Sequence, residues 1–136
     1  MTTAVDSSVI LDVLTGSGPE AGASLRALRK ASIEGRLIIS ESVVAEIRPA
    51  FQDGAQFQEF LGDWGLEFVP SSLQSATLAG EMLRQMLARK RRREGRVVPD
   101  FLIGAHAMEN AERLLARDRG FLRDYFAKLN LWDPTA

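Results

Sequence analysis

Residues 3–11 read TAVDSSVIL, a short apolar run that ends at Asp6 and is followed by two serines and a second apolar run. Residues 3–5 have the length and composition of a β-strand. Either serine can cap a helix over residues 7–14, which the following Gly16 would end. We therefore expect a strand, an acidic residue and a helix in direct succession, which is how an alternating α/β chain begins.

The rest of the chain repeats this alternation. Further strands are expected at residues 36–39, 66–69, 113–116 and 129–132. Helices are expected at residues 19–34, 41–48, 55–64, 72–92, 99–112 and 121–126. Strands that are separated by helices join through right-handed crossovers into a parallel sheet with helices on both faces. The sequence therefore predicts one α/β domain over residues 1–136, built on a parallel sheet of four to five strands.

The composition excludes several classes of site. With 136 residues, the chain is long enough for one domain with a substantial core. A net charge of −1 gives no general attraction to nucleic acid or membrane. The absence of Cys excludes disulfides, thiol nucleophiles and Cys-ligated metals, and the single His106 excludes a multi-histidine metal site. No membrane span or secretory signal is recognisable, so a cytoplasmic protein with no membrane partner is expected.

Four acidic residues lie beside apolar runs at separate points of the chain: Asp6, Glu46, Asp100 and Asp118. A carboxylate resists burial unless another group pairs with it. Two of the acids follow expected strands, and the other two lie in helices that neighbour strands. Because ligands of open parallel sheets bind beyond the carboxyl ends of the strands, all four acids can reach one edge of the sheet. Their placement suggests a shared cation.

Helical geometry supports the placement of one of these acids. Gly104, Ala107 and Ala111 lie within about 40° of Asp100 around the helix axis. This stripe of small residues lets the helix pack closely against its neighbour and holds Asp100 near the edge of the core. His106 lies on another face of the same helix, and we expect it to be structural.

Taken singly, each acid also has an ordinary structural interpretation. Asp6 and Asp100 can cap helices, Glu46 can face solvent, and Asp118 suits a turn before Gly120. Only their joint spacing favours a common metal site. A structural role is expected for three further acids, Asp12, Glu41 and Asp124.

A group of carboxylates requires a counter-charge. Two unit charges 4 Å apart repel by about 1 kcal/mol in water and by several times more near a protein interior. Mg²⁺ and Mn²⁺ prefer oxygen ligands and usually keep several waters and substrate phosphate oxygens. An ion of this kind can generate hydroxide and stabilise the attacking and leaving oxygens of phosphodiester cleavage, without a His or Ser nucleophile.

Three segments resemble the PIN domain, and more narrowly the VapC-type toxins of bacterial toxin–antitoxin pairs: residues 6–12 (DSSVILD), 99–107 (PDFLIGAHA) and 114–121 (LLARDRGF). Glu46 and the ending LWDP at residues 131–134 are also similar, so the resemblance runs from about residue 3 to residue 133. No single motif is decisive, but the order and spacing of all four acids is a specific signal. The resemblance implies a three-layer α/β/α sandwich.

The resemblance also implies a Mg²⁺- or Mn²⁺-dependent endoribonuclease that acts as the toxin of a type II toxin–antitoxin pair. Its catalytic metal ligands map to the four acids Asp6, Glu46, Asp100 and Asp118. Ser7 matches a position whose hydroxyl supports the site or caps the helix. The chain departs from the family at Ala116, where a Thr or Ser is common two residues before the last acid. The implied partners are an RNA substrate, a VapB-like antitoxin and a second copy of the chain in a homodimer.

A basic run leads toward the third acid; its residues are Arg89, Lys90, Arg91, Arg92 and Arg93. Such a run can attract the phosphate backbone of RNA. It can equally be a solvated helix end, where cations interact favourably with the helix dipole. Both interpretations stay open, and the proximity of the run to Asp100 in the sequence slightly favours a role in substrate binding.

Apolar side chains on the second, third and fourth expected helices, and between the third and the fourth, exceed what one helix pair needs. They are Leu25, Leu28, Val43, Val44, Ile47, Phe51, Phe57, Phe60 and Trp64. Most of them are expected in the core, and some can form a groove for the antitoxin.

Two other functions stay open. A PIN fold that keeps its acids for stability or partner recognition would be a non-catalytic binding module. A metal-dependent phosphatase-like domain on a similar sheet would need a Lys near the last strands, and Lys128 is the only candidate. Metal-dependent cleavage of RNA separates these functions from the ribonuclease.

Overall fold

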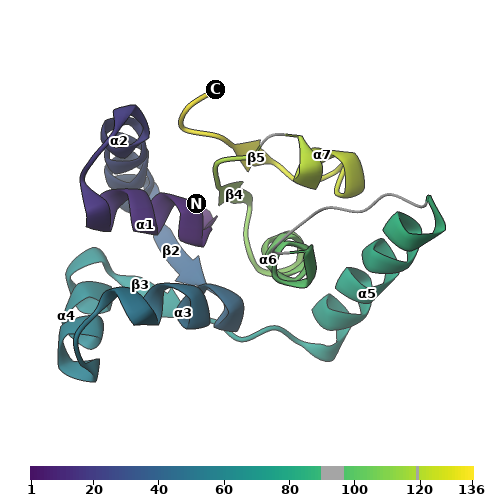
Figure 1. The fold of residues 1–136 in the computed structure, drawn as a ribbon, viewed down its shortest axis with the longest axis horizontal. Helices are drawn as coiled ribbons and strands as arrows, with labels where there is room; N and C mark the ends of the chain where they lie inside the picture. The colour runs from purple at the N-terminus through teal and green to yellow at the C-terminus, as the bar shows by residue number, and fades with distance from the viewer. Residues whose placement is uncertain (90–96, 119) are drawn as a thin grey trace.

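A computed structural model describes residues 1–89, 97–118 and 120–136, in which strands and helices alternate (Figure 1). The strands are β1 (Thr2–Val5), β2 (Arg36–Ile39), β3 (Leu66–Phe68), β4 (Arg113–Leu115) and β5 (Leu131–Trp132). The α-helices are α1 (Ser7–Thr15), α2 (Pro19–Glu34), α3 (Glu41–Ile47), α4 (Gly54–Trp64), α5 (Leu73–Ala88), α6 (Val97–Asn110) and α7 (Phe121–Tyr125). A 3₁₀ turn, η1 (Arg48–Ala50), follows α3.

Over the described ranges the strands form one parallel sheet in the order β3-β2-β1-β4-β5. β1 is central, since Ala4 pairs with Ile38 of β2 on one side and with Leu114 of β4 on the other. α2 packs on β2 from one face, whereas α6 packs on β1 and β4 from the other (Figure 1). α5 packs on the outside of α6. The predicted α/β/α sandwich with a parallel sheet is confirmed.

The first helix begins at an acid and ends at a glycine. Asp6 is its N-cap, because Asp6 Oδ2 accepts a hydrogen bond from the Ser8 N–H over 3.2 Å. Gly16 ends the helix at φ 64°, a left-handed conformation that glycine adopts without strain. The prediction that Ser7 or Ser8 caps this helix is therefore wrong. Both serines lie in its first turn, because the Asp6 carboxylate takes the capping hydrogen bond one position earlier.

Apart from the end of α5, the other element boundaries differ by only one or two residues from the predicted ones. β3 and β4 are each one residue shorter than expected, and β5 begins at Leu131. α6 begins at Val97, two residues before Pro99. Proline is tolerated in the first turn, where a backbone N–H has no partner within the helix. α5 ends at Ala88, and its predicted extension to residue 92 reaches into residues outside the described ranges.

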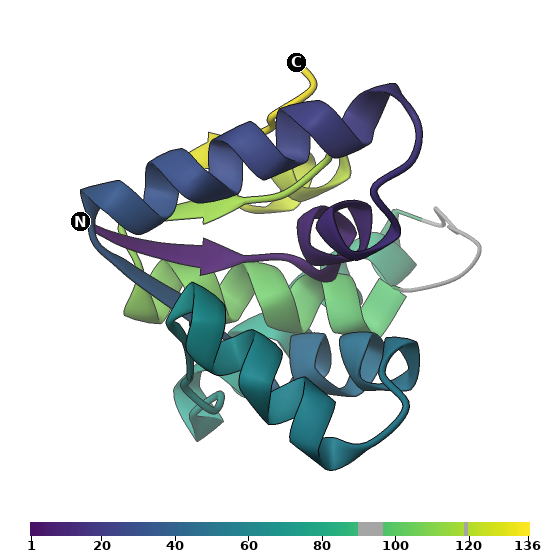
Figure 2. The ribbon, with the colours of Figure 1, turned by 90° about the vertical axis from the view of Figure 1, so that its left-hand side faces the viewer.

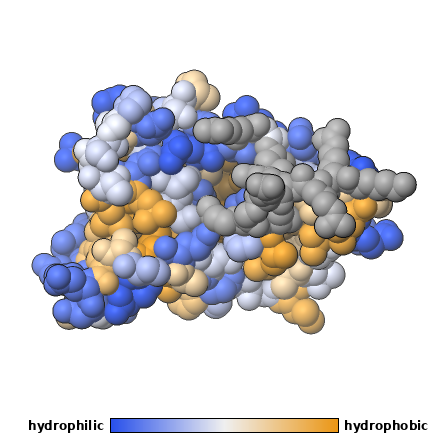
Figure 3. Space-filling view, viewed as in Figure 1, coloured by the Kyte–Doolittle hydropathy of each residue, from blue (hydrophilic) through white to orange (hydrophobic). Residues whose placement is uncertain are grey.

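The core lies between the sheet and the helices on its two faces. Four residues of the predicted apolar set are buried in it, namely Leu28, Val43, Ile47 and Phe57. The other five are only half-buried, namely Leu25, Val44, Phe51, Phe60 and Trp64. On the face drawn in Figure 3, an apolar area lies between α1 and α4. Among the described helices, none combines the length and the apolar character needed to cross a bilayer.

Candidate metal site at the carboxyl edge of the sheet

The first acid lies where the strand order reverses. From β1 the chain adds β2 and β3 on one side and later β4 and β5 on the other. Open parallel sheets bind ligands beyond the carboxyl ends of the strands at such a switch point. Asp6 follows β1 directly, has only 6% of its surface exposed, and donates its N–H to the Leu115 carbonyl of β4 over 2.9 Å. Figure 2 shows α1 and α3 on the side toward which the β1 arrow points.

The Ser8 hydroxyl connects this acid to the loop that carries the fourth one. It donates a hydrogen bond to Asp6 Oδ2 over 2.5 Å and accepts one from the Arg117 N–H over 3.2 Å. Asp118 is the next residue, so Ser8 joins the two segments that hold Asp6 and Asp118. Only the position of Ser8, two residues after Asp6, could have indicated this role from the sequence.

The neighbouring Ser7 hydroxyl connects the same edge to α3. It donates a hydrogen bond to Glu46 Oε1 over 3.1 Å, and the Ser7 side chain is fully buried. Because Ser7 follows Asp6 in the chain, this bond brings the α3 acid next to the end of β1. The structure thus relates Asp6, Glu46 and Asp118 to one another through two consecutive serines.

The third acid, Asp100, is half-buried in the first turn of α6. The next residue, Phe101, is 1% exposed and packs edge-on against Tyr125 with ring centroids 5.1 Å apart. One turn further on, Gly104 faces the Phe126 ring so closely that an added Cβ would lie 2.5 Å from it. The expected close packing along Gly104 is therefore present. It holds α6 against the segment after α7, and α6 also packs on β1, β4 and α3, the elements that carry or adjoin the other acids.

The fourth acid, Asp118, is fixed through its backbone and through one carboxylate oxygen. Its N–H donates to Asp133 Oδ2 over 3.1 Å, and its Oδ1 accepts a hydrogen bond from the Leu122 N–H over 3.2 Å. Its Oδ2 is buried and has no hydrogen-bond partner among the described residues. A buried carboxylate oxygen without a partner is unfavourable unless a cation or another donor satisfies it.

Asp133 was not expected at this edge of the sheet. Its Oδ1 accepts hydrogen bonds from the Thr135 N–H over 2.9 Å and from the Thr135 hydroxyl over 2.7 Å. Burial acts to raise the pKa of Asp133, but the bonds from Thr135 and Asp118, together with the charge of Arg123, bring the pKa below its usual value. No recognisable spacing relates Asp133 to Asp118, because the two meet only through the pairing of β4 with β5.

The chemistry of these residues fits a hard divalent cation. All four expected ligands are carboxylates, which Mg²⁺ and Mn²⁺ prefer. The buried Asp118 Oδ2 is an acceptor that a cation would satisfy. With the side chains as they stand, no three His, Asp or Glu residues of the described ranges are grouped closely enough to hold an ion. The structure therefore links Asp6, Glu46 and the segment of Asp118 at one edge of the sheet, without a coordination shell among the described residues.

Asp12, which we expected to be structural, forms an ion pair beside this region. Its carboxylate accepts hydrogen bonds from Arg117 Nε over 2.8 Å and Arg117 Nη2 over 3.0 Å. It also accepts one from the Ser24 hydroxyl over 2.6 Å. This pair ties α1 and α2 to the residue before Asp118. Asp124, the other acid given a structural role, is exposed on α7.

His106 and Glu41 lie in a separate polar cluster that holds the segment between β3 and α5. His106 is 1% exposed, and its Nε2 lies 2.7 Å from the Val69 carbonyl oxygen. Burial lowers the pKa of His106, although the Val69 carbonyl, Glu41 and Glu109 act in the opposite direction. Glu41 does more than the expected first-turn acid, because it accepts hydrogen bonds from the N–H and the hydroxyl of Ser71 at 2.5 and 2.8 Å.

Burial acts to raise the pKa of Glu41, but these two bonds from Ser71, with smaller contributions that include His106, bring it below its usual value. Both residues of the cluster are thus engaged in structural contacts.

The basic run is described only at its first residue. The Arg89 guanidinium lies over the Tyr125 ring, 5.1 Å from its centroid. Lys90, Arg91, Arg92 and Arg93 lie outside the described residues. Lys128, the residue required by the phosphatase alternative, is exposed in the turn after α7.

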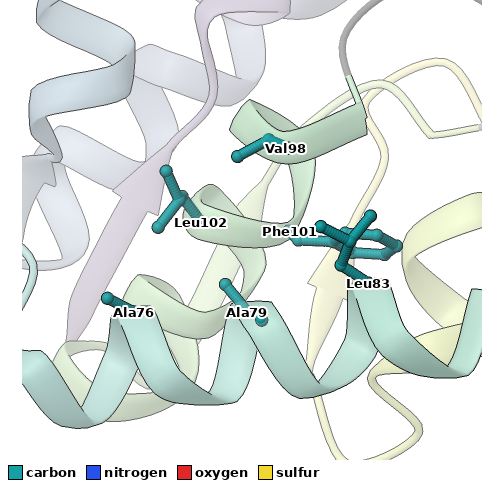
Figure 4. Close-up of a pocket in the computed structure, with 7 residues that line it drawn as sticks. Ala76, Ala79, Leu83, Val98, Phe101 and Leu102 are labelled. Atoms are coloured by element: carbon teal, nitrogen blue, oxygen red, sulfur yellow. The ribbon is translucent and has the colours of Figure 1, made fainter.

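An apolar cavity of about 120 Å³ lies between α5 and α6 (Figure 4). Its lining residues are Ala76, Ala79, Gly80, Leu83, Val98, Phe101 and Leu102. Because none of these residues carries a polar side-chain atom, the cavity offers no ligand to a cation and no group for catalysis.

Comparisons with known proteins agree with this geometry. The family model for the PIN domain matches residues 3–126. Among curated proteins, no sequence matches this chain.

Three solved structures cover almost the whole chain at low sequence identity. VapBC2 from Rickettsia felis, bound to a DNA fragment from its promoter, is 20% identical with a TM-score of 0.70, covering 97% of this chain and 98% of that chain. VapBC-1 from nontypeable Haemophilus influenzae is 18% identical with a TM-score of 0.71, covering 100% of both chains. FitAcB from Neisseria gonorrhoeae is 18% identical with a TM-score of 0.70, covering 98% of both chains. These likenesses show a shared fold.

Proposed function

The chain belongs to the PIN domain family, and on that premise we propose that it is a Mg²⁺- or Mn²⁺-dependent endoribonuclease, the toxin of a type II toxin–antitoxin pair. The observation that carries this proposal is the series of contacts from Glu46 through Ser7, Asp6 and Ser8 to the segment of Asp118. It relates three of the four acids at the switch point of the sheet, where open α/β folds bind their ligands. The buried, unpaired Asp118 Oδ2 supports a cation in that place.

The four acids would be the ligands of the metal. A bound Mg²⁺ or Mn²⁺ supplies a nucleophile by lowering the pKa of water and stabilises the charge on the attacking and leaving oxygens. Asp6 and Asp118 would hold it from the ends of β1 and β4, and Glu46 and Asp100 from α3 and α6. Ser7 would orient Glu46, and Ser8 would orient Asp6, through the hydrogen bonds already described.

The basic run would bind the RNA backbone close to this site. Its residues 89–93 end four positions before the start of α6, the helix whose first turn carries Asp100. Arg and Lys that neutralise phosphates give binding that weakens as salt concentration rises. Arg89 lies over the ring of Tyr125, the last residue of α7, and α7 packs against α6. These contacts support a position of the first residue of the run near α6 and α7.

A VapB-like antitoxin would cover part of the apolar surface between α1 and α4, and the toxin would form a homodimer. The likeness to VapBC2 and VapBC-1 supports a partner of this kind. The half-buried Phe51 and Phe60, with ring centroids 5.3 Å apart, offer an aromatic surface to an apolar segment of such a partner.

Cleavage of RNA by the purified, antitoxin-free protein tests the proposed function. Cleavage should require Mn²⁺ or Mg²⁺, stop with EDTA, and be lost in Asp100→Asn. Asp63→Asn, which changes an exposed aspartate on α4, is the matched control and should cleave like the wild type. A folded protein that leaves RNA intact with every divalent metal would instead support a non-catalytic binding module. Metal-dependent hydrolysis of a phosphate monoester, lost in Lys128→Ala, would support the phosphatase.

A further inference from the structure

We infer that Asp133, in the segment after β5, is a positioning residue that fixes Asp118 so that one of its carboxylate oxygens is left for the metal. This inference rests on the function proposed above. Asp133 lies 15 residues after Asp118 in the chain, and its Oδ2 accepts the hydrogen bond from the Asp118 N–H. It would act through Asp118 without touching the metal or the substrate.

The contact follows from the way the last strand is paired. β5 is parallel to β4, and the pairing continues beyond β4, because the Ala116 N–H donates to the Trp132 carbonyl over 3.1 Å. Two residues after Ala116 comes Asp118, and one residue after Trp132 comes Asp133. The edge of the sheet thus places an acceptor opposite the Asp118 amide.

Asp133 is itself held by the residues that follow it. Its Oδ1 accepts both hydrogen bonds from Thr135, which leaves Oδ2 for the Asp118 N–H. With both oxygens engaged, Asp133 is suited to orient Asp118 and is less suited to be a fifth ligand. A charged acceptor generally makes a stronger bond to a backbone N–H than a neutral acceptor would.

The consequence for Asp118 is a defined division of its hydrogen bonds. The Asp118 N–H is bound by Asp133, and Asp118 Oδ1 accepts the N–H of Leu122 at the start of α7. The Asp118 Oδ2 is the buried oxygen without a partner. These two hydrogen bonds, one to Asp133 after β5 and one from Leu122 of α7, determine which carboxylate oxygen of Asp118 stays available. Loss of the Asp133 anchor would let the loop turn and present a different atom.

Three variants of the full chain separate positioning from general stability. Asp133→Ala removes the acceptor of the Asp118 N–H. Asp133→Asn removes the negative charge but keeps one oxygen that can accept this bond; its NH₂ group then faces Thr135, so the bond from the Thr135 N–H is lost. Thr135→Val removes one hydrogen bond to Asp133 and leaves the contact with Asp118 intact, so it is the matched control for the C-terminal segment.

Two measurements on these proteins are needed. The first is hydrogen exchange of the Asp118 amide in metal-free protein, which should be much faster in Asp133→Ala than in the wild type and Thr135→Val. The second is Mn²⁺ affinity by calorimetry. Loss of a residue that orients a metal ligand typically weakens binding by about 10- to 100-fold. We expect a loss in this range for Asp133→Ala, substantial rescue in Asp133→Asn, and wild-type affinity in Thr135→Val.

Several outcomes would overturn the inference. One is an Asp133→Ala protein that binds Mn²⁺ with unchanged affinity. Another is a Thr135→Val protein that binds Mn²⁺ as weakly as Asp133→Ala, since this would show that the whole C-terminal segment, and not the Asp133 carboxylate, determines the affinity. Equal impairment of Asp133→Asn and Asp133→Ala would assign the effect to charge. If Asp133→Ala does not fold, Asp133→Ser, whose short side chain leaves the Asp118 N–H without its acceptor, takes its place with the same expected loss. A wild-type protein that binds no Mn²⁺ would refute the proposed function and the role of Asp133 in metal binding. Hydrogen exchange of the Asp118 amide would still show whether Asp133 holds that amide.

Discussion

The Ser7 hydroxyl donates a hydrogen bond to Glu46 Oε1 over 3.1 Å, which joins the first residue of α1 to the last turn of α3. Residues 39 positions apart are thereby connected at the carboxyl end of the central strand. This contact gives the α3 acid a fixed relation to Asp6, the residue that precedes Ser7. Glu46 is thus more than a solvent-facing acid on a helix.

Ser7→Ala should weaken both the fold and the metal site. Loss of a hydrogen bond of this kind lowers the free energy of unfolding by about 1 kcal/mol. Loss of the group that orients Glu46 should weaken Mn²⁺ binding by about tenfold. Urea unfolding and calorimetry measure the two effects. Ser40→Ala is a sharp control, since the Ser40 Oγ is buried without a hydrogen-bond partner and its removal should be neutral or stabilising. Equal effects in the two variants would contradict the role given to Ser7.

Gly104→Ala should destabilise the protein, although alanine is the better helix former by about 1 kcal/mol. The added Cβ would lie 2.5 Å from Phe126 Cε2, and the Phe126 ring is buried, so α6 or the ring must move. Overpacking of this kind typically costs about 1–3 kcal/mol. Gly80→Ala in α5 is the matched control, because no atom lies within 4 Å of its added Cβ, and it should stabilise by about 0.5–1 kcal/mol. Urea unfolding that ranks the two variants the other way would contradict the close packing of α6.

The stability of the protein should fall as pH decreases through the range where His106 titrates. Burial holds the pKa of His106 below the usual 6.5, despite the opposing effect of Val69, Glu41 and Glu109. As pH falls through 6.5, the unfolded chain takes up a proton that folded His106 resists, so unfolding becomes more favourable. Urea unfolding at several pH values between about 7.5 and 5 should show a steeper loss of stability in the wild type than in His106→Gln. Parallel curves would show that His106 has the same pKa in both states.

Reversal of charge in the basic run should weaken RNA binding without loss of stability. Arg91→Glu with Arg92→Glu would reduce the number of phosphates neutralised, so binding should weaken and depend less steeply on salt. Arg26→Glu with Arg29→Glu changes two exposed arginines on α2 by the same charge and should affect binding less. Filter binding in EDTA at several salt concentrations measures the RNA affinity and its salt dependence for each double variant. Identical salt dependence in the two double variants would assign the run to a solvated helix end.

The fold could be predicted from the sequence largely because strands and helices alternate and Gly or Pro mark most of their ends. The helix cap was misassigned because Asp6 and Ser7 are both good capping residues, and the choice depends on Ser7 being buried against Glu46. The contact of Ser8 with the Asp118 segment and the contact of Asp133 with Asp118 could not be predicted, because they depend on the pairing of β1 with β4 and of β4 with β5. At position 116, where the family often has a Thr or Ser, this chain has an alanine whose side chain is buried. The loop that follows is held by the hydrogen bond from the Asp118 N–H to Asp133.

The most direct test of the account is the position of Mn²⁺ in crystals of the protein, located by anomalous diffraction. The account predicts one or two Mn²⁺ peaks at the carboxyl end of β1, with the carboxylates of Asp6, Glu46, Asp100 and Asp118 turned toward them and Asp118 binding through Oδ2. A Mn²⁺ peak bound by other residues would contradict it, as would the absence of Mn²⁺ at this edge of the sheet at a concentration that supports RNA cleavage.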